Sequence, residues 1–168
     1  MKKYLIGTVV VIIIFLGTVI YKEKNTPIFT HFPVQILEEM RGKSAEASLY
    51  LFLFFSKKNC ATCLNGIVKV LNGLSPPFYV LGVVPGNELE DEPALRRITK
   101  AAFPLSSFDK YRRYAPVYFP TLIGVSPSGK VVFVLPGETV QSSRLESFLS
   151  FVYAKLYNLL GNGETQID

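Results

Sequence analysis

The sequence has no tryptophan and, among its 168 residues, only two cysteines and one histidine. A structural zinc site needs four cysteine or histidine ligands, usually in two regularly spaced pairs. Cys60 and Cys63 form one such pair, but His31 lies in a separate polar segment and no second pair exists. A copper-delivery site would also need a histidine beside the thiolates. We therefore expect this protein to use no metal and no other cofactor.

A strong excess of charge is also missing. Without Lys2 and Lys3 the chain has 16 basic and 13 acidic residues, a net charge of +3. This balance is too mild to indicate a nucleic-acid partner. The charges are segregated, with four acids at 87–92 and six bases between Arg96 and Arg113. We interpret them as solvated helix faces, and a patch that docks an acidic partner or anionic lipid is the alternative.

One long apolar run stands near the N-terminus. Residues 4–21, "YLIGTVVVIIIFLGTVIY", carry no charge over 18 residues. As a helix this run would be about 27 Å long, close to the roughly 30 Å hydrocarbon core of a bilayer. A cleavable signal peptide would have a shorter apolar region and a small-x-small cleavage site, which "GTVIYKEK" does not offer. We predict an uncleaved anchor at 4–21 that crosses the lipid bilayer of the cell membrane once, after a cytoplasmic stub at 1–3.

The rest of the chain reads as one domain on the extracytoplasmic side. We expect a polar tether at 22–32, a folded domain at 33–160 and a C-terminal tail at 161–168. The apolar runs at 48–55 and 78–84 are typical of strands buried on both faces in the centre of an α/β sheet. Helical patterns, a turn and a hairpin complete a predicted α/β fold in which helices flank a central mixed sheet. Helices are expected at 33–42, 60–74, 92–103, 106–114 and 143–161, and the hairpin at 120–135, around "SPSG".

Both cysteines lie where the first buried strand meets the next helix. Asn59 is a favoured N-cap residue, which places Cys60 in the first helical turn. The unpaired N–H groups of that turn, with Lys57 and Lys58 just upstream, would lower the pKa of the Cys60 thiol below its ordinary value near 8.5. Cys63 lies one turn further along, close enough to form a disulfide. We assign Cys60 as the nucleophile and Cys63 as the residue that resolves the mixed disulfide.

A purely structural disulfide is a poor alternative for this pair. The bond would close so short a loop that it would constrain the unfolded chain little. The role of Thr62 stays open at this stage. It either donates a weak hydrogen bond to the Cys60 thiolate or only fills a helix position.

With these features the sequence resembles the thioredoxin-like superfamily, above all its membrane-anchored extracytoplasmic branch, which includes the thioredoxins of cytochrome c maturation. The resemblance covers roughly 33–160. It rests on a buried strand running into C-x-x-C at a helix start, a later strand preceded by proline, and a hairpin followed by a terminal helix. In "YFPTLIGVSPSGKVVFVLPG", Pro120 matches the family's cis-proline and Phe119 the residue before it. The resemblance implies that Phe119 and Pro120 bind the substrate chain.

The resemblance further implies a thiol–disulfide oxidoreductase that acts on protein dithiols and disulfides, as a reductant supplied by a membrane electron donor. Two departures matter. Asn59 stands where the family often has tryptophan, and the strand at 78–84 lacks the buried carboxylate that many members use for proton transfer. That role would fall to water, or to Glu88 if its loop folds back. The alternative is a catalytically weak docking module in a membrane-associated assembly.

Overall fold

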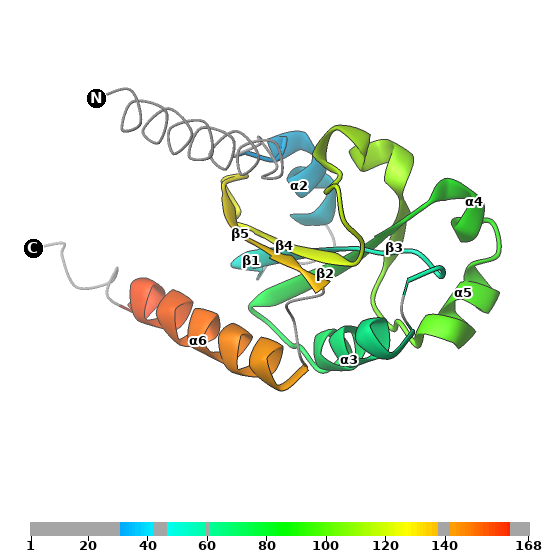
Figure 1. Cartoon of the computed structure of the whole chain (residues 1–168). Helices are drawn as coiled ribbons and strands as arrows, with labels where there is room; N and C mark the ends of the chain where they lie inside the picture. The colour runs from blue at the N-terminus through cyan, green and yellow to red at the C-terminus, as the bar shows by residue number, and fades with distance from the viewer. Residues whose placement is uncertain (1–30, 42–46, 60, 138–141, 162–168) are drawn as a thin grey trace, which may run out of the picture.

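The computed structural model describes residues 31–41, 47–59, 61–137 and 142–161 (Figure 1). The predicted anchor at 4–21 lies outside these residues. Within the described part of the chain, no helix is both long and apolar enough to cross a bilayer.

The centre of the molecule is a mixed sheet of five strands in the order β3-β2-β1-β4-β5. Strand β1 is parallel to β2, and β2 is parallel to β3, whereas β4 is antiparallel to both β1 and β5. The predicted mixed α/β sheet is therefore confirmed. The strands are β1 Leu49–Phe54, β2 Phe78–Val84, β3 Leu105–Ser107, β4 Thr121–Val125 and β5 Val131–Pro136.

Helices cover both faces of this sheet (Figure 1). Helices α3 and α6 lie below it in this view, and α2 lies above it together with the 3₁₀ helix η1. The two short helices α4 and α5 follow β2 in the chain. The bounds are α2 Val34–Arg41, α3 Ala61–Asn72, α4 Gly86–Leu89, α5 Glu92–Thr99, η1 Phe108–Tyr114 and α6 Ser142–Gly161.

Strand β1 is the centre of two separate apolar clusters. All six of its residues are buried, and successive side chains point to opposite faces of a strand. Leu49, Leu51 and Leu53 pack in the cluster that includes α3 and α6. Tyr50, Phe52 and Phe54 pack in the cluster on the other face, with residues of α2 and η1. The uninterrupted apolar run of the sequence thus corresponds to a strand buried on both sides, as predicted.

Helix α5 ends earlier than the sequence pattern predicts. Asp91 caps its N-terminus, accepting a hydrogen bond from the backbone N–H of Ala94. The helix stops at Thr99, not at 103, because Lys100 adopts a left-handed conformation with φ of 60°. The guanidinium of Arg96 then donates to the carbonyls of Ala101 and Phe103, which holds this segment out of the helix.

The segment expected as a short helix at 106–114 begins as an edge strand. Leu105–Ser107 pairs with Gly82–Val84 of β2, and the helix that follows is of the 3₁₀ type. Three half-buried residues are too few to show a strand period. The predicted hairpin is confirmed, and its turn closes with a 2.9 Å hydrogen bond from the Gly129 N–H to the Ser126 carbonyl.

The folded domain also includes the last two residues of the predicted tether. Phe32 is buried, and its backbone N–H donates to the carbonyl of Gly129. Its ring stacks on Phe52 at 4.6 Å between centroids. His31 forms an isolated antiparallel bridge with Lys130.

Candidate active site

The candidate site is built on the loop that leaves the carboxyl end of β1. Phe55 remains hydrogen-bonded to the sheet, because its N–H donates to the carbonyl of Val83 in β2. The chain then turns tightly, since the N–H of Asn59 donates to the carbonyl of Ser56 at 3.0 Å. The N–H of Ser56 donates in return to the side-chain oxygen of Asn59 at 2.6 Å. These bonds fix the loop directly before the first cysteine.

Asn59 joins this loop to a second segment 60 positions further along the chain. Its side-chain nitrogen donates to the carbonyl oxygen of Phe119 at 3.0 Å. The Phe119–Pro120 peptide bond is cis, as the resemblance implied. Three of the predicted site residues are therefore brought together, and Asn59, at the position where the family often has tryptophan, makes the connection.

The cis-proline segment is itself held on several sides. The carbonyl of Pro120 accepts a 2.7 Å hydrogen bond from the N–H of Gly137. The ring of Phe119 lies 5.9 Å from that of Phe108. The two residues before Phe119 face solvent, with 68% of Val117 and 49% of Tyr118 exposed. An apolar, accessible surface thus adjoins the cis-proline.

The remaining predicted site residues are placed only in part. Cys60 lies outside the described residues. Helix α3 begins at Ala61 and contains Thr62 and Cys63, whose side chains are also outside the description. Their bonding, the Cys60–Cys63 disulfide included, stays a prediction. Lys57 and Lys58 are exposed on the loop.

One residue of the site, Glu88, could be named from the sequence only as a conditional alternative. Helix α4 does fold back onto the dithiol loop, and the Glu88 carboxylate is 4% exposed. One of its oxygens accepts from the Ser56 hydroxyl at 2.6 Å, and the other from the Lys57 N–H at 2.7 Å. Nothing in the local sequence marks Glu88 apart from its three acidic neighbours, since the contact depends on the tertiary fold.

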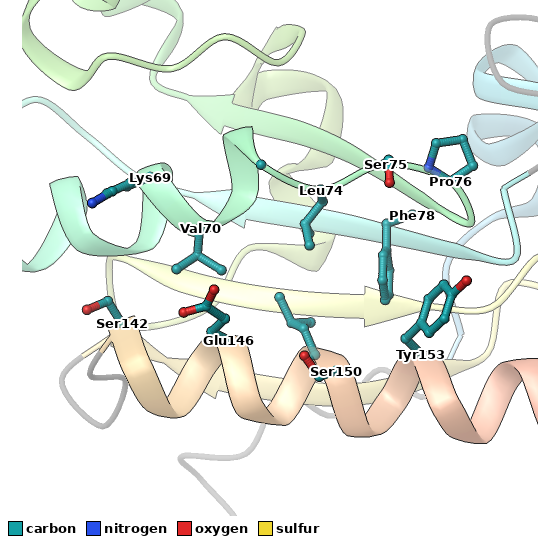
Figure 2. Close-up of a pocket in the computed structure, with 12 residues that line it drawn as sticks. Lys69, Val70, Leu74, Ser75, Pro76, Phe78, Ser142, Glu146, Ser150 and Tyr153 are labelled. Carbon is teal, nitrogen blue, oxygen red and sulfur yellow. The ribbon is translucent and has the colours of Figure 1, made fainter.

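A separate hollow of about 530 Å³ lies between the end of α3, the following 73–78 segment and α6 (Figure 2). Leu74, Phe78 and Tyr153 are among the residues that line it, together with Lys69 and Glu146. None of the predicted site residues takes part. In the ranges that the structure describes, no group of three histidine, cysteine or acidic side chains could hold a metal ion.

No family model matches this chain, and no curated protein matches it significantly by sequence. Solved structures do match its fold. StoA from Bacillus subtilis superimposes with a TM-score of 0.50 at 14% identity, covering 62% of this chain and 84% of StoA. The thioredoxin domain of a thiol-disulfide oxidoreductase from Bacteroides vulgatus gives 0.51 at 19% identity, with coverages of 66% and 82%. A secreted Mycobacterium tuberculosis disulfide oxidoreductase, homologous to E. coli DsbE, gives 0.50 at 13% identity, with coverages of 63% and 83%.

These likenesses establish the class of fold. The domain has a thioredoxin-like fold, with C-x-x-C at the junction of β1 and α3 and a cis-proline before β4.

Proposed function

We propose that this protein is a thiol–disulfide oxidoreductase that exchanges disulfides with protein substrates through Cys60 and Cys63. The observation that carries the proposal is the 3.0 Å hydrogen bond from the Asn59 side chain to the Phe119 carbonyl. It ties the residue next to Cys60 to the residue next to the cis-proline. An extended substrate chain bound along Val117–Phe119 would thus lie beside the nucleophile, as in strand-addition modes of peptide recognition.

The proposed reaction is a two-step exchange. The Cys60 thiolate attacks one sulfur of a substrate disulfide, so that a mixed disulfide forms and the other substrate sulfur leaves as a thiolate. The Cys63 thiolate then attacks the sulfur of Cys60 and releases the second substrate sulfur. The substrate gains two electrons and two protons, and the protein is left with a Cys60–Cys63 disulfide. A reduced dithiol donor must reverse this change before the next cycle.

We further propose a setting for this reaction. The uncharged run at 4–21 would anchor the domain in the cell membrane with its active site on the extracytoplasmic side. A membrane protein that carries electrons from the cytoplasm would then regenerate the dithiol. Reduction of substrate disulfides, as in the cytochrome c maturation branch of the superfamily, is the direction we favour.

The equilibrium reduction potential of the Cys60–Cys63 couple tests whether the dithiol exchanges disulfides and whether it acts as a reductant or as an oxidant. The full chain, purified in detergent, is equilibrated in glutathione buffers, and the fraction of free thiol is measured. We expect a potential near that of thioredoxin, about −270 mV, whereas a value near −120 mV would indicate an oxidant. A disulfide that never opens in these buffers would rule out the proposed exchange.

A catalytically weak docking module is the second candidate. Strand β2, "FYVLGVV", carries no carboxylate that could move the proton of the resolving cysteine. Reduction of insulin disulfides with dithiothreitol distinguishes the two candidates, with Cys60→Ser as the comparison. Equal rates for the two proteins would leave only the docking function.

A further inference from the structure

Glu88 is a buried carboxylate that takes no part in the two steps of the exchange reaction as written above. It is 4% exposed and lies in the four-residue helix α4. Acidic side chains are almost never fully buried unless they are paired or strongly hydrogen-bonded. Among the described residues, Glu88 has no cationic side chain as a partner, and the ion pair found there joins Arg96 to Glu92. The hydrogen bonds of Glu88 must therefore offset the free-energy cost of burying its carboxylate.

Both carboxylate oxygens of Glu88 bond the loop that carries the dithiol. The Ser56 hydroxyl donates to one oxygen at 2.6 Å, and the Lys57 N–H donates to the other at 2.7 Å. Hydrogen bonds in which the donor or the acceptor is charged are about twice as strong as those between neutral groups. The Ser56 hydroxyl also accepts from the Lys58 N–H at 3.1 Å. One carboxylate thus holds Ser56 and Lys57 directly, and Lys58 through the Ser56 hydroxyl.

The same hydrogen bonds continue to the cis-proline. The N–H of Ser56 donates to the Asn59 side chain, and Asn59 donates in turn to the Phe119 carbonyl. Glu88, Ser56, Asn59 and Phe119 therefore form one connected network that runs from α4 to the substrate edge. Members of such networks depend on one another, so losing one bond loosens the rest.

Stability alone is a weak reason for this arrangement. The loop is partly open to solvent, with Lys57 and Lys58 exposed, so water could serve the same donors. Burying a carboxylate costs free energy that its hydrogen bonds have to offset. Water could accept these hydrogen bonds without fixing the positions of the donors, whereas the buried acid holds the loop in one geometry.

We propose that Glu88 is a positioning residue for the dithiol. It holds the 56–59 loop so that Asn59 stays bonded to Phe119, which keeps the loop before the dithiol beside the cis-proline edge. The inference rests on the proposed function, because it assigns Glu88 a part in the exchange with protein disulfides.

The test compares two rates in the full chain for Glu88→Ala and for Glu90→Ala. Glu90 is an exposed acid two residues away, so its replacement changes the charge equally without touching the loop. Both proteins are reduced, and their rates with insulin disulfides and with iodoacetamide are measured well below their unfolding temperatures. Insulin needs the cis-proline edge, whereas iodoacetamide needs only an accessible thiolate.

Glu88→Ala is expected to slow the reaction with insulin about tenfold or more while changing the iodoacetamide rate less than about threefold. The rates of Glu90→Ala with insulin and with iodoacetamide should both equal those of the wild-type protein. An insulin rate unchanged in Glu88→Ala overturns the proposal, and so does a proportional fall of both rates, which would mean an effect on the thiol itself. If the alanine variant does not fold, Glu88→Gln replaces it, because it keeps the volume and one acceptor oxygen, and an intermediate rate is expected.

Deuterium uptake separates this proposal from the proposed function. Uptake by peptides that contain residues 56–59 should rise in Glu88→Ala and stay unchanged in Glu90→Ala. If the original chain does not react with insulin at all, the proposed function fails, and uptake alone decides whether Glu88 orders the loop. Unchanged uptake in Glu88→Ala would then overturn the positioning role as well.

Discussion

Gly137 packs directly against Pro120, and its backbone N–H donates a 2.7 Å hydrogen bond to the carbonyl oxygen of that proline. A Cβ atom on residue 137 would lie 2.8 Å from this same oxygen and would also strike the proline ring. Contacts this short are not tolerated, so a larger residue must displace one of the two segments. The end of β5 therefore determines how closely the cis-proline segment can approach the sheet.

Gly137→Ala is therefore expected to displace the cis-proline segment, although Gly137 is not itself one of the predicted site residues. Overpacking of this kind destabilises a fold by about 1–3 kcal/mol, and here the strain would move the proposed substrate edge. We expect a lower denaturant midpoint and slower reduction of insulin disulfides. Gly73→Ala is the control, because a Cβ there would meet its nearest neighbour at an ordinary 3.5 Å. Equal behaviour of the two variants would contradict the prediction.

Asn59→Ala should separate stability from exchange activity. The substitution removes the bonds to Ser56 and Phe119, at a cost of about 1–2 kcal/mol in the free energy of unfolding. Asn72→Ala is a matched control, since Asn72 also makes two side-chain bonds, to Lys100 and Ala102, from the other end of α3. Both variants should lose stability in chemical denaturation, and only Asn59→Ala should react more slowly with insulin. A comparable slowing in Asn72→Ala would show that stability alone governs the rate.

The thiol of Cys60 should have a pKa below the ordinary value of about 8.5. Helix α3 has no acidic residue in its first turn, and Lys57 and Lys58 precede it on the exposed loop, so nearby charge favours the thiolate. The rate of iodoacetamide alkylation against pH, measured in Cys63→Ser, reports this pKa. Replacing both lysines by glutamine should raise it, whereas Lys69→Gln near the end of α3 should not. A midpoint at or above about 8.5 in the original sequence would contradict the proposed activation.

The hydroxyl of Tyr79 should lower the stability of the folded protein at alkaline pH. Burial raises the pKa of its hydroxyl above the ordinary value of 10.0, and the nearby Tyr111 and Tyr50 add to the shift. The unfolded chain therefore loses this proton at lower pH than the folded chain, so the folded state binds more protons above about pH 10. Stability is fully present below that pH and falls as the pH rises through the folded pKa. Chemical denaturation at several alkaline pH values should show a shallower loss in Tyr79→Phe than in the original protein, and an equally steep loss would refute this assignment.

Elements with a strong apolar pattern could be predicted from the sequence almost to the residue. The run "FYVLGVV" corresponds to β2, and the turn at Gly129 and the cis bond before Pro120 lie where they were expected. The signals for β2 and for the turn are local, because they depend on hydrophobic periodicity and on the chemistry of proline and glycine, whereas the cis bond was expected from the thioredoxin resemblance.

Features that depend on partners distant in sequence could not be predicted in the same way. Strand β3 forms because β2 offers it a free edge, and α5 ends early because Arg96 bonds the carbonyls beyond it. Glu88 belongs to the site through contacts that span 31 and 32 positions of the chain. No local pattern distinguishes it from Glu90, which stays exposed.

The alternation of leucines and aromatic residues along β1 limits how the position of the cysteines can change. Leucines of the strand fill one core and its aromatic residues the other, so a slip by one position would place each set in the core shaped for the other. The strand therefore cannot shift along the sheet to bring the cysteines nearer to, or farther from, a partner. Adjustment of that distance is confined to the five residues 55–59, where one inserted residue could move Cys60 by up to about 3.5 Å.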